Sequence, residues 1–437
     1  MNILILNQYA LPSGSPGITR HGDLAKVLVK RGHQVTIVAS GFDYLTRQQD
    51  RTAGKKILKE NYSGVDFIWL KTTNYKGNDG KRVKSMLDYS IKALLQSLKL
   101  KNKPDIVIAS SPHLLTGLTG FLLSAYKRIP LLLEIRDLWP SSLVDLGAIK
   151  ANSLLHRILV KLEKFLYEKA TGIITIPPLA YKRVQELLGE SDKCTHIPNG
   201  IVINDDRKIF QDVKLPESFL KILEREKNRK IIIYAGAHGV ANNLENVLET
   251  ADYLREHNLN IYDQIAILFI GGGQKREELI NLTQEKKHNH IHFHPPIDKL
   301  LLKRMLAHGD MLLLHLADAQ VFTYGVSPNK LYDYFDAAKP VLFSSPIENN
   351  IVNQIQAGIT FLPGRPKKLA EAIDFILKAS DKERISMGDN ARNYVRKYHN
   401  CEELAVKLEK LCLKCMNEDN FTYSGTLNAN LADLLNK

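Results

Sequence analysis

The feature that most constrains this chain is a repeated order of short apolar runs and amphipathic helices. Runs such as NILILN, QVTIVAS, IVIASS and LLLEI do not alternate apolar with polar residues, and helical patterns separate them. Strands of this kind are buried on both faces, because crossover helices cover each side of a parallel sheet. The first half of the chain therefore predicts a doubly wound α/β domain.

The pattern stops after PNGI and then begins again. A charged connector over residues 204–230 precedes new apolar runs in IIIYAGAHG, IAILFIGGG, IHFHPP, MLLLHL and KPVLFSS. A chain of 437 residues is too long for one core, so two domains are expected. We predict two Rossmann-like domains, over 1–205 and 206–395, that face each other across a cleft. Residues 396–437 are expected to form a helix that packs back on the first domain, with a polar tail.

Cysteine usage and the amino-terminal segment indicate the compartment. Four cysteines in so long a chain argue against a disulfide framework and for a reducing environment. The start, MNILILNQYA, is too short and lacks the basic residues of a signal peptide. No apolar run approaches the ~18 residues of a membrane-spanning helix. The sequence therefore predicts a cytoplasmic protein.

The net charge of +13 predicts an anionic partner. Residues 71–103 hold eight Lys and one Arg against two Asp, a local balance of 9 − 2 = +7. In this region Met86, Leu87, Ile91, Leu94, Leu95 and Leu98 recur at helical spacing. We interpret them as the core-facing side of a surface helix; the alternative is a basic amphipathic surface held at an anionic membrane. Nucleic acid is disfavoured, since no RNA-binding signature or zinc finger occurs.

Three glycine-bearing loops follow predicted strands. The first, with Gly14 and Gly17, lacks a tight G-x-G-x-x-G followed by an acid, so a nicotinamide site is disfavoured. A loop that closes over a ligand fits it better. The second holds Gly236 and Gly239, and the third is the glycine run at 271–273. Glycines at such turns let the backbone approach an anion at the start of the next helix.

The stretch SPNKLYDYFDAAKPV at residues 327–341 is the stronger signal. Pro328 suits the first helical position and Ser327 the cap. The helix start would present the N–H groups of Asn329, Lys330 and Leu331 to an anion. Lys330 adds a positive charge, and Asp333 could accept hydrogen bonds from sugar hydroxyls. Phosphate at the helix start and ribose at the acid describe a nucleoside diphosphate; the plain alternative is a capped helix with a solvent-facing Asp.

These segments resemble, in order and spacing, the retaining family 4 glycosyltransferases of GT-B architecture. The chain is most similar to the branch that builds bacterial O-antigen, capsule and other surface polysaccharides. The matching segments are HGDLAKVLVKRGHQVTIVAS, LEIRDLWPSSL, IPNGI, IYAGAHG, ILFIGGG and SPNKLYDYFDAAKPV.

The resemblance implies that the second domain binds a nucleotide-sugar donor and the first domain an acceptor. Of the family's two paired glutamates, the second falls on Asp333 and the first on Gly325, which is a departure. The family's Arg and Lys fall on Ala237 and Asn242, which leaves Lys330 and the helix start to neutralise the diphosphate. The predicted donor-binding residues are Gly17, Gly236, His238, Gly239, Lys275, His294, Ile297, Val326, Ser327, Asn329, Leu331 and Asp333.

A catalytic histidine of the family falls on Arg136, in EIRD. Glu134, Arg136 and Asp137 thus become candidates for sugar or acceptor contacts, and His113 follows the end of a strand that leads to the cleft. The predicted catalytic residues are Lys330, Arg136, Asp137 and His113.

We therefore predict a hexosyltransferase that moves an N-acetylated or deoxy hexose from a UDP-linked donor to a polyprenyl-diphosphate-linked glycan. The enzyme would act at the inner face of the plasma membrane, in surface polysaccharide biosynthesis. No D-x-D triplet occurs, so neither a metal nor another cofactor is expected. The alternatives are a GT-B nucleotide-sugar epimerase and a non-catalytic protein that binds sugar nucleotides.

Overall fold

The computed structural model describes residues 1–15, 17–43, 51–75, 77, 80–189, 192–203, 213–347 and 350–417. The chain divides into two compact units, Met1–Pro198 with Cys401–Lys437 and Asn199–Asn400. The predicted boundary at 205/206 and the predicted polar tail both lie outside the described residues.

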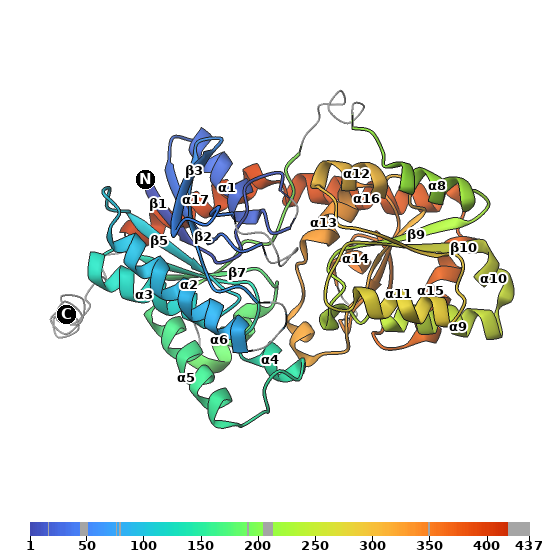
Figure 1. Ribbon diagram of the computed structural model, residues 1–437, viewed down its shortest axis with the longest axis horizontal. Helices are drawn as coiled ribbons and strands as arrows, with labels where there is room; N and C mark the ends of the chain where they lie inside the picture. Colours follow the sequence, from blue (N-terminus) through green and yellow to red (C-terminus); the bar gives the residue numbers. More distant parts are fainter. Residues whose placement is uncertain are drawn as a thin grey trace. The chain divides into compact units, whose positions relative to one another are not determined.

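The first unit contains an eight-stranded sheet in the order β3-β4-β2-β1-β5-β6-β7-β8 (Figure 1). Only the pairing of β3 with β4 is antiparallel; the other pairs are parallel. Its strands are β1 (Asn2–Leu6), β2 (Gln34–Ser40), β3 (Ile57–Tyr62), β4 (Val65–Leu70), β5 (Ile106–Ser110), β6 (Leu131–Ile135), β7 (Gly172–Thr175) and β8 (Cys194–His196). Its helices are α1 (Arg20–Lys30), α2 (Gly80–Leu98), α3 (Leu114–Lys127), α4 (Ser141–Asp145), α5 (Leu154–Lys169), α6 (Ala180–Leu188) and α17 (Cys401–Asn417).

Helices cover both faces of this sheet, as the unalternated strands require. Helices α2, α3 and α5 lie along one face and α1 and α17 along the other (Figure 1). Although α17 comes from the end of the chain, its buried side chains join those of β1, β2 and α1 in one core.

The second unit repeats the design with a six-stranded parallel sheet in the order β11-β10-β9-β12-β13-β14. Its strands are β9 (Lys230–Ala235), β10 (Ile265–Ile270), β11 (Ile291–His294), β12 (Met311–Leu314), β13 (Val341–Ser344) and β14 (Gly358–Phe361). Its helices are α8 (Glu217–Arg225), α9 (Glu245–His257), α10 (Leu259–Gln264), α11 (Arg276–Glu285), α12 (Lys299–Leu306), α13 (Asn329–Asp336), α14 (Ile351–Gln354), α15 (Pro366–Lys378) and α16 (Asp381–Tyr398), with 3-10 turns η1 (Val240–Asn242) and η2 (Gln320–Tyr324). Two separate cores lie on the two faces of the sheet. The predicted doubly wound α/β class is confirmed.

Helix α2 is oriented opposite to the prediction. Most of its buried side chains are small or polar, namely Ser85, Ser90, Ala93, Gln96 and Ser97. The larger Met86 and Tyr89 are buried as well. Leu87, Ile91 and Leu95 point outward, with exposed fractions of 45%, 58% and 46%. The core-facing interpretation of the leucine-rich side is therefore wrong. Small side chains let α2 pack closely on α3, and the buried Ser85 hydroxyl accepts from Gln8 Nε2, after β1, at 3.2 Å.

Among the helices of the described ranges, none combines the length and apolar character that crossing a bilayer requires.

Candidate functional site

The SPNK turn and α13 lie at the carboxyl end of the second sheet. Ser327 does not cap the helix; the position before α13 is Pro328, in extended conformation and without a side-chain cap bond. The predicted capping role is wrong because the Ser327 hydroxyl is buried and paired elsewhere, at 2.7 Å from the Tyr332 hydroxyl. The Leu331 N–H donates to Pro328 O at 3.1 Å, so this predicted donor is used within the turn. The helix start therefore offers an anion the N–H groups of Asn329 and Lys330 only.

The Lys330 ammonium lies beside the start of this helix in an uncharged environment. Nζ donates to the Tyr234 hydroxyl at 2.9 Å and to Asn242 Oδ1 at 2.6 Å, and it stands 4.4 Å from the centre of the Tyr234 ring. No carboxylate contacts it among the described residues. Burial lowers the pKa of Lys330 to about 7, because a desolvated ammonium without an anionic partner is disfavoured. Such a group would gain most from an incoming anion.

Gly236 makes room for this lysine. Its φ is +154°, and a Cβ there would lie 3.3 Å from Lys330 Cδ and 3.4 Å from Nζ. The next residue, Ala237, uses its carbonyl to accept from the Tyr234 hydroxyl at 2.7 Å and from Asn242 Nδ2 at 3.0 Å. Asn242 is fixed in turn by His315, whose Nδ1 lies 2.8 Å from Asn242 O. Sequence reasoning missed Tyr234, although its position at the end of β9 was a usable signal.

The second and third glycine loops pack against each other. A Cβ on Gly271 would fall 2.0 Å from Gly236 O, and one on Gly273 would fall 2.5 Å from His238 O. The His238 N–H donates to Gly272 O at 2.8 Å. The glycine run is therefore needed for the contact between two backbones, whatever else it binds. Gly239 differs, since a Cβ there would meet nothing within 4 Å.

His238 is fully buried within reach of the rings of Tyr234, Phe269 and Phe293. Neither ring nitrogen has a hydrogen-bond partner in the described part of the chain. Burial, with Arg276 and Lys330 nearby, lowers the pKa of His238 to about 4. The enclosed, neutral imidazole argues against the predicted donor-binding role of His238.

Five other predicted donor-binding residues have different surroundings. The Lys275 ammonium is already neutralised by Glu278 at 2.8 Å and Glu245 at 3.2 Å, and these carboxylates raise its pKa. The buried His294 ring is turned toward Ser218 of α8 and Pro295 O. These contacts argue against donor-binding roles for both side chains. Ile297 and Val326 pack on the edge of the core beside α13, and Asp333 is half-buried one turn into that helix.

In the first unit, Glu134 is held in a buried ion pair. Its carboxylate accepts from Arg20 Nε at 3.0 Å and Ser110 Oγ at 2.7 Å, and lies 2.8 Å from His21 Nε2. Arg20 also donates to the carbonyl of Ile197 at 2.7 Å. Burial alone would raise the pKa of Glu134, but Arg20 and His21 hold it well below its usual range. The carboxylate ties β6 to α1 and the end of β8, and these contacts argue against the suggested sugar contact.

His113 also has a structural environment. It precedes α3 and is buried, with Nε2 2.8 Å from Gln8 Oε1 and 3.2 Å from the Thr116 hydroxyl. Burial, with Arg82 nearby, lowers the pKa of His113 to about 3. This geometry does not favour the predicted catalytic role, because the ring is neutral and already paired.

Arg136 and Asp137 follow β6 directly, and Nη1 of Arg136 is buried. Arg136 is half-buried and Asp137 exposed. Their backbone N–H groups point to the Ser111 hydroxyl, at 2.8 and 3.5 Å. Gly17, with φ +107°, belongs to the loop that Leu11 N and Ile18 O close at 3.0 Å. The structure thus places these residues at the carboxyl end of the first sheet.

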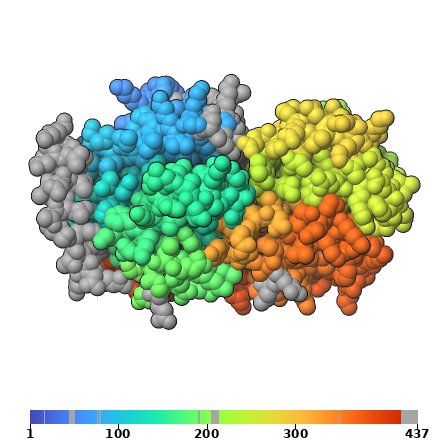
Figure 2. Space-filling view, turned by 90° about the horizontal axis from the view of Figure 1, so that it is seen from below, coloured from blue at the N-terminus to red at the C-terminus, as the bar shows by residue number. Residues whose placement is uncertain are grey.

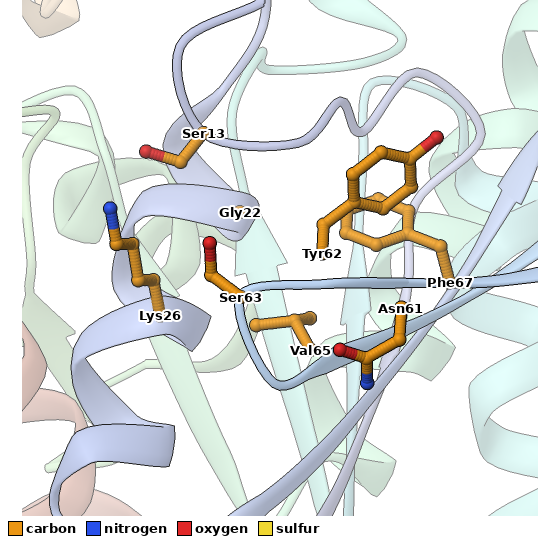
Figure 3. A pocket seen from close by; sticks show the side chains of 8 residues that line it. All are labelled: Ser13, Gly22, Lys26, Asn61, Tyr62, Ser63, Val65 and Phe67. Atoms are coloured by element: carbon orange, nitrogen blue, oxygen red, sulfur yellow. The ribbon is translucent and has the colours of Figure 1, made fainter.

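A pocket of about 240 Å³ in the first unit lies apart from these groups (Figure 3). The Lys26 ammonium is directed toward it from α1, and the Ser13 and Ser63 hydroxyls from two turns. It is lined by Ser13, Gly22, Lys26, Asn61, Tyr62, Ser63, Val65 and Phe67. None of the predicted site residues contributes to it.

Two family models match the chain, one in each unit. A glycosyl transferase 4-like domain matches residues 17–200, and glycosyl transferases group 1 matches residues 217–394. The chain is 24% identical to the probable glycosyltransferase WbjE of Pseudomonas aeruginosa over 307 residues, which cover 69% of this chain and 74% of WbjE. It is 23% identical to the putative colanic acid biosynthesis glycosyl transferase WcaI of Escherichia coli over 308 residues, covering 67% and 71%.

Solved structures show the same fold. A sucrose-phosphate synthase from Thermosynechococcus elongatus superimposes with a TM-score of 0.71 at 15% identity, covering 94% of this chain and 98% of the synthase. Anabaena HepE in complex with UDP-glucose gives 0.63 at 15% identity, covering 95% and 100%. These similarities confirm the predicted GT-B fold.

Proposed function

The chain belongs to the glycosyltransferases that join a family-4-like domain to a group 1 domain, and we propose that it moves a hexose from a nucleoside diphosphate sugar to a lipid-linked glycan. UDP is the proposed nucleotide, in line with the UDP-glucose complex of HepE. The name of WcaI, a putative colanic acid biosynthesis glycosyl transferase, supports the proposed role in surface polysaccharide biosynthesis. An N-acetylated or deoxy hexose is the proposed sugar.

The observation that carries this proposal is the environment of Lys330. An ammonium with two neutral hydrogen-bond partners and an aromatic ring beneath it lies next to the start of a helix. The positive end of the helix dipole and the two N–H groups of its first turn add to the same field. A diphosphate would supply the negative charge that this cluster lacks.

The proposed chemistry uses that field on the leaving group. The bond between the anomeric carbon and the diphosphate oxygen breaks, and the acceptor hydroxyl oxygen bonds to the same face of that carbon. Because attack and departure occur on the same face, configuration is retained without a carboxylate nucleophile. The hydroxyl proton passes to the departing diphosphate. Lys330 would stabilise charge that grows on the diphosphate as the bond breaks, which is where a fixed cation contributes most. No metal ion is part of this proposal.

On the first domain, Arg136 and Asp137 are the proposed contacts to the acceptor. They are polar residues, Arg136 half-buried and Asp137 exposed, at the carboxyl end of a parallel sheet, where such folds bind ligands. Glu134 and His113 hold the strands and helices behind them and are not proposed to contact substrate.

The test is transfer from radiolabelled UDP-sugars to a polyprenyl-diphosphate-linked saccharide, with the stereochemistry of the product read by NMR. Binding of UDP by calorimetry measures the donor site separately. An epimerase would instead convert the free nucleotide sugar without an acceptor. Conversion in acceptor-free reactions, or UDP binding that does not respond to substitution of Lys330, would contradict the proposal.

A further inference from the structure

Helix α2 carries a continuous apolar stripe on its outer side. Val83, Leu87, Ile91 and Leu95 are spaced four residues apart, and their exposed fractions are 55%, 45%, 58% and 46%. The half-buried Leu94 and Leu98 fall within the same stripe at helical spacing. Large aliphatic side chains scattered singly over a surface need no explanation, but an unbroken row along one helix face does.

The neighbouring helices extend this surface. Helix α3 packs between α2 and α5 on the same face of the sheet (Figure 1). At the start of α5, Leu154, Leu155 and Ile158 are exposed by 77%, 52% and 52%. This three-helix layer can be followed in Figure 2 by its colours, from light blue (α2) to green (α5). The same layer therefore presents aliphatic residues from two separate helices.

Positive charge surrounds the stripe. Exposed lysines lie on α2 and in the loop that follows it, at Lys81, Lys84, Lys99, Lys101 and Lys103. On α5, Arg157, Lys161 and Lys164 are exposed near the aliphatic end. Aliphatic groups that enter the acyl region while ammonium groups meet acidic headgroups are the pattern of a helix lying in a membrane interface.

We propose that the α2 stripe inserts into the surface of an anionic bilayer, with α5 as a second contact. A second copy of this chain is a poorer occupant, because pairing two such stripes would bring the two sets of lysines together. Apolar insertion rather than charge alone would then hold the protein on the membrane. Binding would therefore persist at salt concentrations that screen exposed charges.

This inference rests on the proposed function only in its choice of partner, since a lipid-linked acceptor is found in a bilayer. The two can fail separately. Donor binding depends on the second unit, whereas docking depends on α2 and α5 of the first.

The test is flotation of the purified full-length protein with vesicles of phosphatidylcholine and phosphatidylglycerol. The variant Leu87→Ser/Ile91→Ser should lower the partition coefficient by more than about tenfold, since partition scales with the apolar area buried. The matched control is Phe375→Ser/Ile385→Ser, two side chains exposed by 55% and 62% in the second unit, and it should bind like the parent protein. A charge variant, Lys84→Gln/Lys99→Gln, should weaken binding at low salt but little at roughly 0.5 M salt.

Melting temperatures and calorimetry with UDP verify that each variant is folded and binds donor. Parent-like flotation of the Leu87→Ser/Ile91→Ser variant would overturn the proposal. So would a parent protein that sediments as a dimer without vesicles while this variant sediments as a monomer, because the stripe would then be a self-association surface. A parent protein that floats with the vesicles but does not bind UDP would contradict the proposed function and still support the docking surface.

Discussion

Replacing Lys330 with Met tests the central feature of the donor site. Met fills similar space and retains the apolar stem, but it removes the ammonium that Tyr234 and Asn242 hold in place. A hydrogen bond to a charged group contributes about 1.5–3 kcal/mol, which is roughly 10- to 150-fold in rate. Because diphosphate charge increases as the glycosidic bond breaks, we expect kcat to fall more than donor affinity.

The same substitution has a predicted effect on stability. The pKa of Lys330 is lowered from 10.5 to about 7 in the folded protein, so between these values the unfolded chain binds more protons. The free energy of unfolding of the parent protein should therefore rise as pH increases through this window, by up to about 1.4 kcal/mol per pH unit from this group. The variant lacks this contribution. The Lys330→Met variant should therefore have the larger free energy of unfolding near neutral pH. The difference from the parent protein should become smaller toward pH 10.

Two measurements decide the matter: steady-state transfer kinetics, and denaturant unfolding from pH 7 to 10 without ligand. Lys275→Met is the matched control, because that ammonium is already paired with Glu278 and Glu245 and should lose little activity. Equal losses in the two variants, or no loss in Lys330→Met, would refute the assignment of Lys330. A difference in stability between parent and variant that does not vary with pH would refute the claim that Lys330 lies in uncharged surroundings.

Three further outcomes follow from the geometry. Tyr234→Phe should lower kcat/KM by about tenfold while leaving the fold intact, because it frees the ammonium from one anchor; parent-like kinetics would remove Tyr234 from the site. Glu134→Gln should destabilise the first unit by about 3–5 kcal/mol, since it leaves Arg20 buried without its anion, and an unchanged denaturation midpoint would contradict this. Gly271→Ala should prevent native packing, because a Cβ there would lie 2.0 Å from a carbonyl oxygen, whereas Gly239→Ala should fold normally; circular dichroism and solubility compare the two.

The strand pattern predicted most of the fold because parallel, doubly covered strands have a distinctive sequence. Every apolar run quoted above contains a strand: β1, β2, β5, β6 and β9 to β13. The strand β3 was missed because ILKENY is polar, antiparallel and at the edge of its sheet. The edge strand β14, GITF, was missed because four residues give too little pattern. An edge strand is hydrogen-bonded on one side only, so its sequence is less constrained, although the edge strand β11 was still predicted from IHFHPP.

The site was predicted less evenly, since sequence shows which residues carry charge but not what already neutralises it. Lys330 and Lys275 look alike in sequence, yet one has neutral partners and the other two carboxylates. The glycine run was assigned to ligand approach, whereas backbone packing between neighbouring loops explains at least two of its members. Tyr234 escaped because an aromatic residue at the end of a buried strand is usually core.

Helix α2 shows where periodicity fails in principle. A helical period of apolar residues fixes which side chains share a face, and that part of the prediction holds for Leu87, Ile91 and Leu95. It does not fix where the face points, because the same spacing results whether the apolar side meets a protein core or a lipid surface. The opposite face carried the missing information: Ser85, Ser90, Ala93 and Ser97 are small residues that suit close helix packing, and all four are buried. An amphipathic helix with small residues on its polar side and lysines beside its apolar side therefore predicts an outward-facing apolar stripe.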